Sequence, residues 1–354
     1  MKRVITIGLL VCLTLSVTMM SGFVPFVAAA EKTHETVRIP VLTLPLGAGV
    51  YEWWASYERI FEANHSWLRV SAQETPGFVY NLKEMVNNKS RWKNTIFGTD
   101  VTVEVAAENA IAPFFEKRVD FKPFKYLFPL NGCALSTWLW ATLDPKIKSM
   151  KDFEGKRIGL GFRGQIAWGM RPTAALDTLG VKARLEYLGP IPSVEALLDN
   201  RVDAAQVQTY LEVKTPEAKI PARPLQTLQQ LLAARRTFYY VDYGKDWPER
   251  MQQQKGYTVG TPAEIPAGTL PKQEVNLIGI QTQPDGWAVH ESFPEDLAYE
   301  FTKFMIQHGT KLAKYTETGE YFFIPKGFLQ RFGYTEQNVH PGAIRAYKEA
   351  GLWK

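Results

Sequence analysis

Three glycine-containing turns carry the residues best suited to binding chemistry. They lie at residues 46–51, 75–81 and 161–167, and each stands between an expected strand and an expected helix. The first turn of a helix leaves backbone N–H groups without partners, and the helix dipole favours an anion there. Glycine lets a ligand approach the backbone closely. The pattern predicts one ligand-binding cleft lined by all three turns, although such turns also occur as ordinary connections.

Some side chains in and near these turns are suited to holding an organic anion. Arg163 offers a planar fork that pairs well with a carboxylate, unless it is a solvated surface arginine. Phe78 and Trp168 are harder to assign to a core and are expected to line the pocket. The predicted ligand-binding residues are Gly47, Gly49, Tyr51, Gly77, Phe78, Asn81, Arg163, Gly164, Gln165, Trp168 and Tyr210.

Catalysis finds little support in the sequence. There is no G-x-S-x-G elbow, no H-E-x-x-H motif and no cysteine–histidine spacing typical of a metal site. Cys133 stands in an apolar context typical of core, and His340 precedes Pro341 in what is expected to be a helix start. The turn at residues 47–49 lacks the third glycine and the acidic residue of a dinucleotide site. We therefore expect no catalytic residue, no metal and no cofactor.

The first turns are positioned by two strand-and-helix units. Residues 37–45 and 68–74 have the apolar pattern of strands, and apolar residues recur at helical spacing from Val50 and from Val79. This β-α-β-α order predicts a mainly parallel sheet with helices on its faces.

A second unit in the middle of the chain repeats this order. Strands are expected at 157–161, 185–188 and 202–207, with helices opening at Gly164 and Val194. The other expectations are loops at 216–224 and 256–274, a strand at 275–282 and a closing helix at 343–350. Residues Ser292 to Glu295 resemble a capping box, although Pro294 is also suited to a first helical turn.

The simplest architecture for these elements is a pair of α/β lobes joined by chain crossings near residues 140 and 280. Lobe I would comprise residues 31–140 and a C-terminal return at 280–354, and lobe II would comprise residues 141–279. Ligands of open α/β folds bind beyond the carboxyl ends of the strands, so the cleft is expected between the lobes.

The first thirty residues have the pattern of an export signal. Lys2 and Arg3 precede the uncharged run at residues 4–20, and residues 28–30 supply the small residues that signal peptidase requires. A cut after Ala30 leaves 324 of the 354 residues, and the alternative is an uncleaved membrane anchor. Cys133 is then the single remaining cysteine, so no intramolecular disulfide is possible, and a bacterial periplasm is the expected location.

Charge and composition exclude one class of partner. The net charge is +5, and the basic residues are scattered among aspartate and glutamate rather than gathered in a run with interleaved aromatic residues. Nucleic acid is therefore not an expected partner.

Four segments form a recognisable set. The turn ending at Tyr51, with the pattern G-x-G-x-Y, looks like the longer G-x-G-x-x-Y, and residues 77–82, GFVYNL, are close to G-S-x-x-N-L. Residues 265–271, IPAGTLP, are close to P-A-G-T-Y-P, and residues 340–351, HPGAIRAYKEAG, match H-P-G-A-x-R-Y-Y-x-E-x-G except at Ala346. Together they resemble the TAXI family of solute-binding proteins, which serve tripartite ATP-independent periplasmic (TRAP) transporters.

The resemblance implies a type II periplasmic-binding-protein-like fold and a monomer that delivers a small-molecule ligand to the membrane permease of a TRAP transporter. The chain departs from the family where Phe78 replaces a serine and where residues 165–167, QIA, replace G-S-G-T. The family is associated with glutamate and 2-oxoacids, and these departures favour a bulkier or less polar ligand, still a carboxylate held by Arg163. The alternatives are a ligand-sensing subunit of a membrane signalling protein and an exported enzyme with Cys133 or His340 in the cleft.

Overall fold

A computed structural model describes residues 34–44, 50–163, 165–281 and 283–353. Residues 36–354 form one compact unit. The predicted signal and its cleavage site, the glycines of the first turn, Gly47 and Gly49, and Gly164 of the third turn lie outside the described residues. None of the described helices is long and apolar enough to span a bilayer.

One sheet has five strands in the order β2-β1-β3-β15-β4. Its strands β1, β2 and β3 are parallel, as predicted, and β15 runs antiparallel to both β3 and β4. All residues of β3 and of β15 are buried, because helices cover both faces of the sheet. The strands are β1 (Val37–Leu42), β2 (Leu68–Gln73), β3 (Ile96–Asp100), β4 (Phe124–Phe128) and β15 (Asp285–His290).

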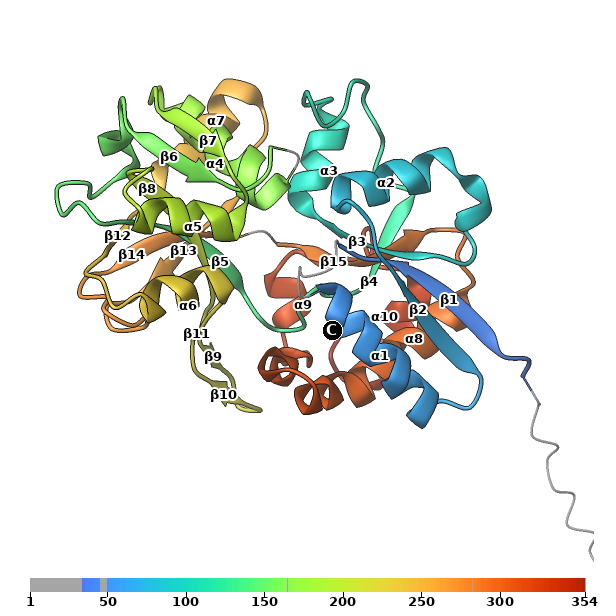
Figure 1. Cartoon of the computed structure of the whole chain (residues 1–354). Coiled ribbons are helices and arrows are strands. Elements are labelled where there is room, and N and C mark those ends of the chain that lie inside the picture. Colours follow the sequence, from blue (N-terminus) through green and yellow to red (C-terminus); the bar gives the residue numbers. More distant parts are fainter. Residues whose placement is uncertain (1–33, 45–49, 164, 282, 354) are drawn as a thin grey trace, which may run out of the picture. The chain divides into compact units, whose positions relative to one another are not determined.

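Five helices enclose this sheet. Figure 1 shows α2 and α3 on one side of it and α1, α8 and α10 on the other. The predicted stripe of α1 is buried, including Trp53, Trp54 and Tyr57. The helices are α1 (Val50–Asn64), α2 (Phe78–Asn87), α3 (Val101–Glu108), α8 (Glu295–His308) and α10 (Pro341–Glu349).

The predicted capping box of α8 is wrong. Pro294, in an extended conformation, is the residue before the helix, so Ser292 lies outside capping position. The Ser292 hydroxyl instead lies 2.8 Å from Nδ1 of His290. The Ser292 hydroxyl therefore bonds to the neighbouring His290 ring and not to the N–H groups at the start of α8.

The second sheet has eight strands. Its main order is β13-β14-β5-β8-β6-β7, with β11 beside β8 and β12 beside β5. The parallel pairs among its described strands are β6 with β7 and β6 with β8, so the expectation of a mainly parallel sheet is wrong here. The strands are β5 (Ser136–Thr142), β6 (Arg157–Leu160), β7 (Arg184–Tyr187), β8 (Ala204–Tyr210), β11 (Arg223–Pro224), β12 (Tyr239–Val241), β13 (Thr261–Ile265) and β14 (Leu277–Gln281).

Two of the predicted loops contain strands. Strand β13 lies in the segment 256–274, and it pairs antiparallel with β14 over its whole length. Strands β10 (Lys219–Ile220) and β11 lie in the segment 216–224, where β10 forms a short hairpin with β9 (Val213–Lys214). Proline and glycine in these segments obscured the strands, because strand propensity depends on the pairing context more than on the residues themselves.

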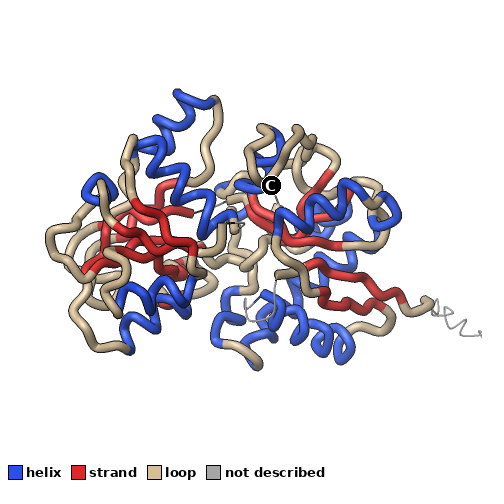
Figure 2. Tube along the Cα trace, turned by 45° about the horizontal axis from the view of Figure 1, so that its top comes forward, coloured by secondary structure: helices blue, strands red, loops and turns tan. Residues whose placement is uncertain are grey.

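Helices cover both faces of the eight-stranded sheet as well. Figure 1 shows α4 and α7 on one side and α5 and α6 on the other, and Figure 2 shows both groups of strands flanked by helices. These helices are α4 (Arg171–Leu179), α5 (Pro190–Leu198), α6 (Gln226–Ala233) and α7 (Asp246–Lys255). Shorter elements are η1 (Lys89–Arg91), η2 (Met150–Phe153), a π-helical turn η3 (Ile166–Met170), η4 (Gly309–Lys314), η5 (Glu317–Tyr321) and α9 (Phe328–Arg331).

The chain passes between the sheets twice. Strand β4 ends at Phe128 and β5 begins at Ser136, while β14 ends at Gln281 and β15 begins at Asp285. The second passage lies next to residue 280, and the lobe boundaries stay a prediction. The position expected for the first, near residue 140, lies inside β5, so the chain changes sheet several residues earlier. The α/β fold with two sheets is confirmed.

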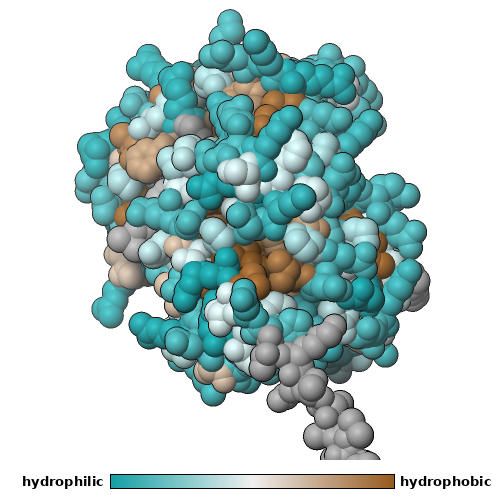
Figure 3. Space-filling view, turned by 90° about the vertical axis from the view of Figure 1, so that its right-hand side faces the viewer, coloured by the Kyte–Doolittle hydropathy of each residue, from teal (hydrophilic) through white to brown (hydrophobic). Residues whose placement is uncertain are grey.

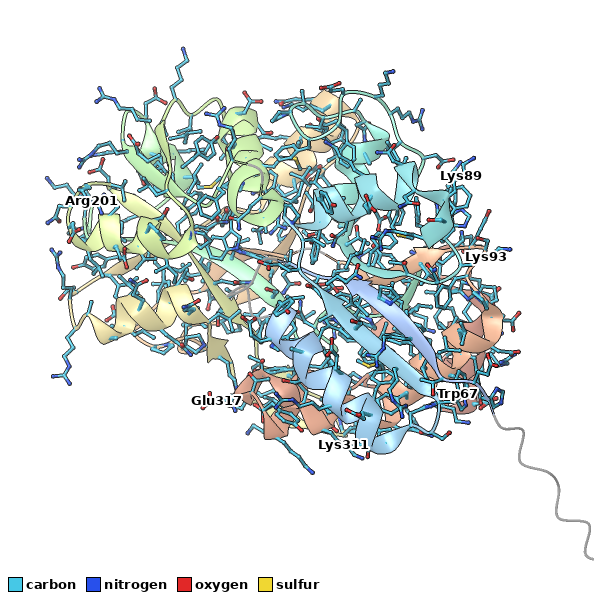
Figure 4. All side chains as sticks on the ribbon, turned by 45° about the vertical axis from the view of Figure 1, so that its right-hand side comes forward. Trp67, Lys89, Lys93, Arg201, Lys311 and Glu317 are labelled. Atoms are coloured by element: carbon cyan, nitrogen blue, oxygen red, sulfur yellow. The ribbon has the colours of Figure 1, made fainter. Side chains whose placement is uncertain are left out.

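Hydrophilic residues dominate one face of the molecule. The face in Figure 3 is largely hydrophilic, with hydrophobic residues in small areas. Lys89, Lys93 and Arg201, labelled in Figure 4, extend outward from the ribbon. An arginine that does not reach the surface is therefore an informative exception.

Candidate functional site

Arg171 is that exception. It begins α4, its exposed fraction is 0%, and its Nε, Nη1 and Nη2 atoms make no hydrogen bond to any residue that the structure describes. A buried cation without acceptors is strongly destabilising, so such groups are normally paired. Arg171 is therefore a candidate anchor for an anionic group supplied by a ligand.

An aromatic ring and a glycine hold the Arg171 side chain in place. The guanidinium carbon lies 4.5 Å from the centroid of the Trp138 ring, which comes from β5. The Arg171 stem lies against Gly260, where an added Cβ would be 3.3 Å from Cδ of Arg171. The face of the indole ring attracts the guanidinium cation, but it does not accept hydrogen bonds from the N–H groups in the guanidinium plane. These N–H groups therefore stay available to an oxyanion.

Asp100 supplies an opposing charge to Arg171. It ends β3 and caps α3, where its Oδ1 accepts from the backbone N–H groups of Thr102 at 2.8 Å and Val103 at 3.0 Å. Burial raises the pKa of Asp100, and the Arg171 charge partly offsets that rise. Burial in turn lowers the pKa of Arg171, and Asp100 opposes the change. The two charges are electrostatically linked without a hydrogen bond between them.

The two sheets meet at this point. The hydroxyl of Thr102, in α3 beside the five-stranded sheet, donates to the carbonyl of Val259 at 3.2 Å. Val259 adjoins Gly260, against which Arg171 packs, and α3 also packs against η3. The Arg171 side chain is thus enclosed by elements that belong to both sheets.

Gln206 adds a polar group on the eight-stranded side. It lies on β8, and its Nε2 donates to the Tyr243 hydroxyl at 2.8 Å and to the Ala167 carbonyl at 3.3 Å. Its Oε1 and the Nε1 of Trp138 are buried and have no partner among the described residues. We define the Arg171 cluster as Asp100, Trp138, Arg171, Gln206 and Tyr243.

A second buried network joins the sheets close to Asp100. Asp285 of β15 pairs with Asp100 in the sheet register, and it accepts from the N–H of Leu130 at 3.3 Å and from Asn131 at 3.4 Å. Burial raises the pKa of Asp285 to about 8. Asn131 Oδ1 accepts from the Tyr210 hydroxyl at 3.1 Å. These bonds stabilise the passage between β4 and β5.

The predicted residues of the second turn pack against the five-stranded sheet or bond to its strands. Gly77 precedes α2 with a φ of 139°, and the Phe78 ring packs on Gly98, where an added Cβ would lie 2.7 Å from Phe78. Asn81 is buried, and its Nδ2 donates to the carbonyls of Leu42, Thr43 and Gly98. Asn81 Oδ1 has no partner in the described part of the chain, so a ligand contact there stays a prediction.

Of the predicted residues in and next to the third turn, Arg163 lies at the surface and Trp168 lies beside the Arg171 cluster. Arg163 is exposed, and its guanidinium carbon lies 4.5 Å from the ring centroid of Tyr187 in β7. Gln165 braces the turn, because its Oε1 accepts from the N–H of Phe162 at 3.0 Å. Trp168 lies edge-on to Trp138, with 6.3 Å between the ring centroids, and so borders the Arg171 cluster.

Two predicted aromatic residues lie elsewhere. Tyr51 is half-buried in the first turn of α1. Tyr210 is buried at the end of β8, with its hydroxyl on Asn131 and its ring against Tyr321. Their part in ligand binding stays a prediction.

A known protein family matches nearly the whole of the described chain. The model of the NMT1-like family matches residues 43–351. The chain belongs to the NMT1-like family. The finer assignment to the TAXI family stays a prediction.

Several solved structures are similar to this NMT1-like chain at low identity. A TctC solute-binding protein from Polaromonas is 14% identical, with 90% of this chain and 98% of that chain covered and a TM-score of 0.47. An R. palustris protein with adipate is 14% identical, with the same coverage and a TM-score of 0.48. The periplasmic aliphatic sulphonate binding protein SsuA of Escherichia coli is 15% identical, with 90% and 80% covered and a TM-score of 0.37.

The residues considered for catalysis have structural contacts in this family member. Cys133 is buried, which raises its thiol pKa to about 12 and keeps it protonated. His340 caps α10 as predicted, with its ring bonded to the N–H of Gly342 and the carbonyl of Phe293. The described residues contain no group of three or more side chains able to hold a metal ion.

The sequence reasoning missed Arg171. Its signal was weak: a charged residue directly after Met170 on a helix whose neighbouring positions are apolar. The exposed Arg163 sits in a glycine-rich turn and therefore attracted the prediction instead. Burial, which separates the two arginines, depends on Trp138 and Gly260 and not on local spacing.

Proposed function

We propose that this protein is a periplasmic solute-binding protein that captures a small organic carboxylate at the Arg171 cluster and delivers it to a membrane permease. The observation that carries the proposal is the fully buried Arg171 guanidinium with no hydrogen-bond acceptor among the described residues. A planar carboxylate matches its two parallel N–H donors.

The location of the cluster supports a binding role. It lies where the end of β3 meets β5 and α4, at the junction of the two sheets, and ligands of open α/β folds bind in such positions. One of the contacts that enclose it is polar, the bond from the Thr102 hydroxyl to the Val259 carbonyl. Bonds of this kind can form on closure over a ligand and break on release.

The passages between the sheets are suited to act as the hinge. Both are short, and the first is held by the bonds of Asn131 to Asp285 and Tyr210. Opening about these passages would expose Arg171 to a solute, and closure would change the surface that a partner contacts.

The sequence patterns supply the cellular part of the proposal. The export-type N-terminus favours the periplasm, with a cut after Ala30, and the segments 77–82 and 340–351 favour a permease of the TRAP type. The protein would then work as a diffusible monomer without a cofactor, and the energy for transport would come from the ion gradient used by the permease.

The proposal is tested by binding and fractionation. Calorimetric titration of the purified protein with a panel of small organic acids is expected to find at least one ligand, and Arg171→Gln is expected to lose it. Arg163→Gln is the matched control, because it removes an arginine from the exposed part of the same segment. Binding that survives Arg171→Gln but not Arg163→Gln would overturn the site. Intact mass of the periplasmic fraction should correspond to a chain that begins at Glu31.

A further inference from the structure

The orientation of the Gln206 side-chain amide is determined by its partners. The Ala167 carbonyl, 3.3 Å from Nε2, can only accept a hydrogen bond, so the nitrogen must face it. The second N–H is directed to the Tyr243 hydroxyl at 2.8 Å. Both amide donors are therefore used, and Oε1 is left as an acceptor with no partner among the described residues at a side chain only 1% exposed.

This acceptor lies on the same side of the sheet as Arg171. Gln206 is directly opposite Trp140 in the β5–β8 register, and Trp138 is two residues along the same strand. Directly opposite and alternate residues share a face, so the indole under Arg171 and the Gln206 amide face the same side. The residues between them, such as Leu139 and Val207, belong instead to the apolar cluster on the opposite side.

The two partners of Gln206 each link it indirectly to Arg171. Ala167, which accepts from Gln206, lies in η3, and this turn runs directly into the helix that begins with Arg171. Tyr243, the other partner of Gln206, acts electrostatically on Arg171. The site therefore offers a cationic donor and a neutral acceptor on one wall.

A ligand that satisfied Arg171 alone would leave the Gln206 oxygen buried and unbonded. We propose that the ligand is a carboxylate that also carries a hydroxyl or amino group, whose O–H or N–H is donated to Oε1 of Gln206. The inference rests on the proposed function and narrows its ligand class. A site with a fixed acceptor discriminates against analogues that lack the donor, because binding them removes the acceptor from water without replacement.

The same donor requirement excludes 2-oxo acids, which are associated with the family that the chain resembles and which the departures at Phe78 and residues 165–167 already disfavour. A 2-oxo acid offers Gln206 only another acceptor, so its carbonyl oxygen would face Oε1 without a hydrogen bond. The corresponding 2-hydroxy acid has the same carbon skeleton and one donor. The 2-oxo and 2-hydroxy acids therefore differ mainly in whether they carry a hydrogen-bond donor at that position.

The experiment compares matched acids on the purified protein by calorimetric titration. Each set has one carbon skeleton, in the 2-hydroxy, 2-amino, 2-oxo and unsubstituted forms. We expect the donor-bearing forms to bind about 10- to 100-fold more tightly than the others. Comparison of the hydroxy and amino forms identifies which donor the site takes.

Two variants locate the preference. Gln206→Met removes the acceptor at similar volume and should bring all forms to within about threefold of each other. Gln230→Met is the control, because Gln230 also has a buried Oε1 without a described partner but lies on α6, across the sheet. Circular dichroism confirms that each variant folds.

The outcomes separate this inference from the function on which it rests. Equal binding of donor-bearing and donor-free acids would overturn the inference and leave carboxylate binding standing, as would a preference that survives Gln206→Met. Equal binding would mean that a buried water accepts the role of the donor to Oε1 of Gln206. Failure of every acid to bind would overturn both.

Discussion

The guanidinium of Arg171 rests on the indole of Trp138, with 4.5 Å from its central carbon to the ring centroid, although Arg171 begins helix α4 and Trp138 belongs to strand β5. The stack orients the cation and leaves its N–H donors without an acceptor in the described part of the chain. An arrangement that is unfavourable for the ligand-free protein is informative about what it binds.

Replacement of Arg171 should separate stability from binding. Arg171→Met removes a buried cation that has no hydrogen bond, which favours the ligand-free fold, but it also leaves the buried Asp100 without its opposing charge. The free energy of unfolding without ligand should therefore change by less than about 2 kcal/mol. The same variant should lose roughly 30-fold or more in carboxylate affinity. Chemical denaturation and calorimetric titration measure the two effects. A variant that is destabilised and still binds would show that Arg171 is a structural residue.

The bond from Thr102 to Val259 should stabilise the enclosed form of the site. Thr102→Val keeps the shape of the side chain and removes the hydroxyl that donates at 3.2 Å. Loss of one neutral hydrogen bond should weaken binding by about 2- to 10-fold, mainly through faster ligand dissociation. Stopped-flow measurement of the dissociation rate checks this. Thr178→Val, a hydroxyl bonded within α4, is the control and should leave the rate unchanged.

Asp285 should make the protein less stable as the pH rises. Burial raises its pKa to about 8 in the folded protein, whereas the unfolded carboxyl titrates near about 4. Between these values the folded protein holds a proton that the unfolded chain has released. The free energy of unfolding therefore falls as the pH increases through that window. Denaturation at pH 5 and pH 8 should show the decrease, and Asp285→Asn should reduce it.

Glu104 should contribute to the same decrease by an independent route. Burial raises its pKa to about 8, and the Tyr126 hydroxyl bonds to it. Glu104→Gln should flatten the pH dependence by an amount similar to Asp285→Asn. A double variant that is no flatter than either single variant would contradict the assignment to two separate groups.

The Phe78 ring should be part of the packing of β3. Gly98→Ala places a Cβ 2.7 Å from Cε1 of Phe78 and 3.1 Å from the Trp287 ring, so it should destabilise the fold by about 1–3 kcal/mol. Phe78→Leu in the same chain should restore part of that loss, and thermal denaturation compares the variants. If the double variant is as unstable as Gly98→Ala alone, Phe78 is not the neighbour that resists the added group.

Local periodicity was sufficient for the elements whose partners are near in sequence. The stripe that includes Trp53, Trp54 and Tyr57 predicted α1, and the alternation of strand and helix predicted β1, β2 and α2. The turn before α10 was also correct, because proline and a capping histidine act within a few residues. Strand β13 was missed because its only signal is pairing with β14.

The sequence by itself therefore determined the α/β class, most helices and the region of the third turn. Only the tertiary structure decided which arginine is enclosed: Arg163 stacks on Tyr187 at the surface, whereas Arg171 is buried between Trp138 and Gly260. The reason is that helix and strand propensity depend on neighbours in the chain. Desolvation of a charge depends on which distant segments surround it, and no local pattern records that.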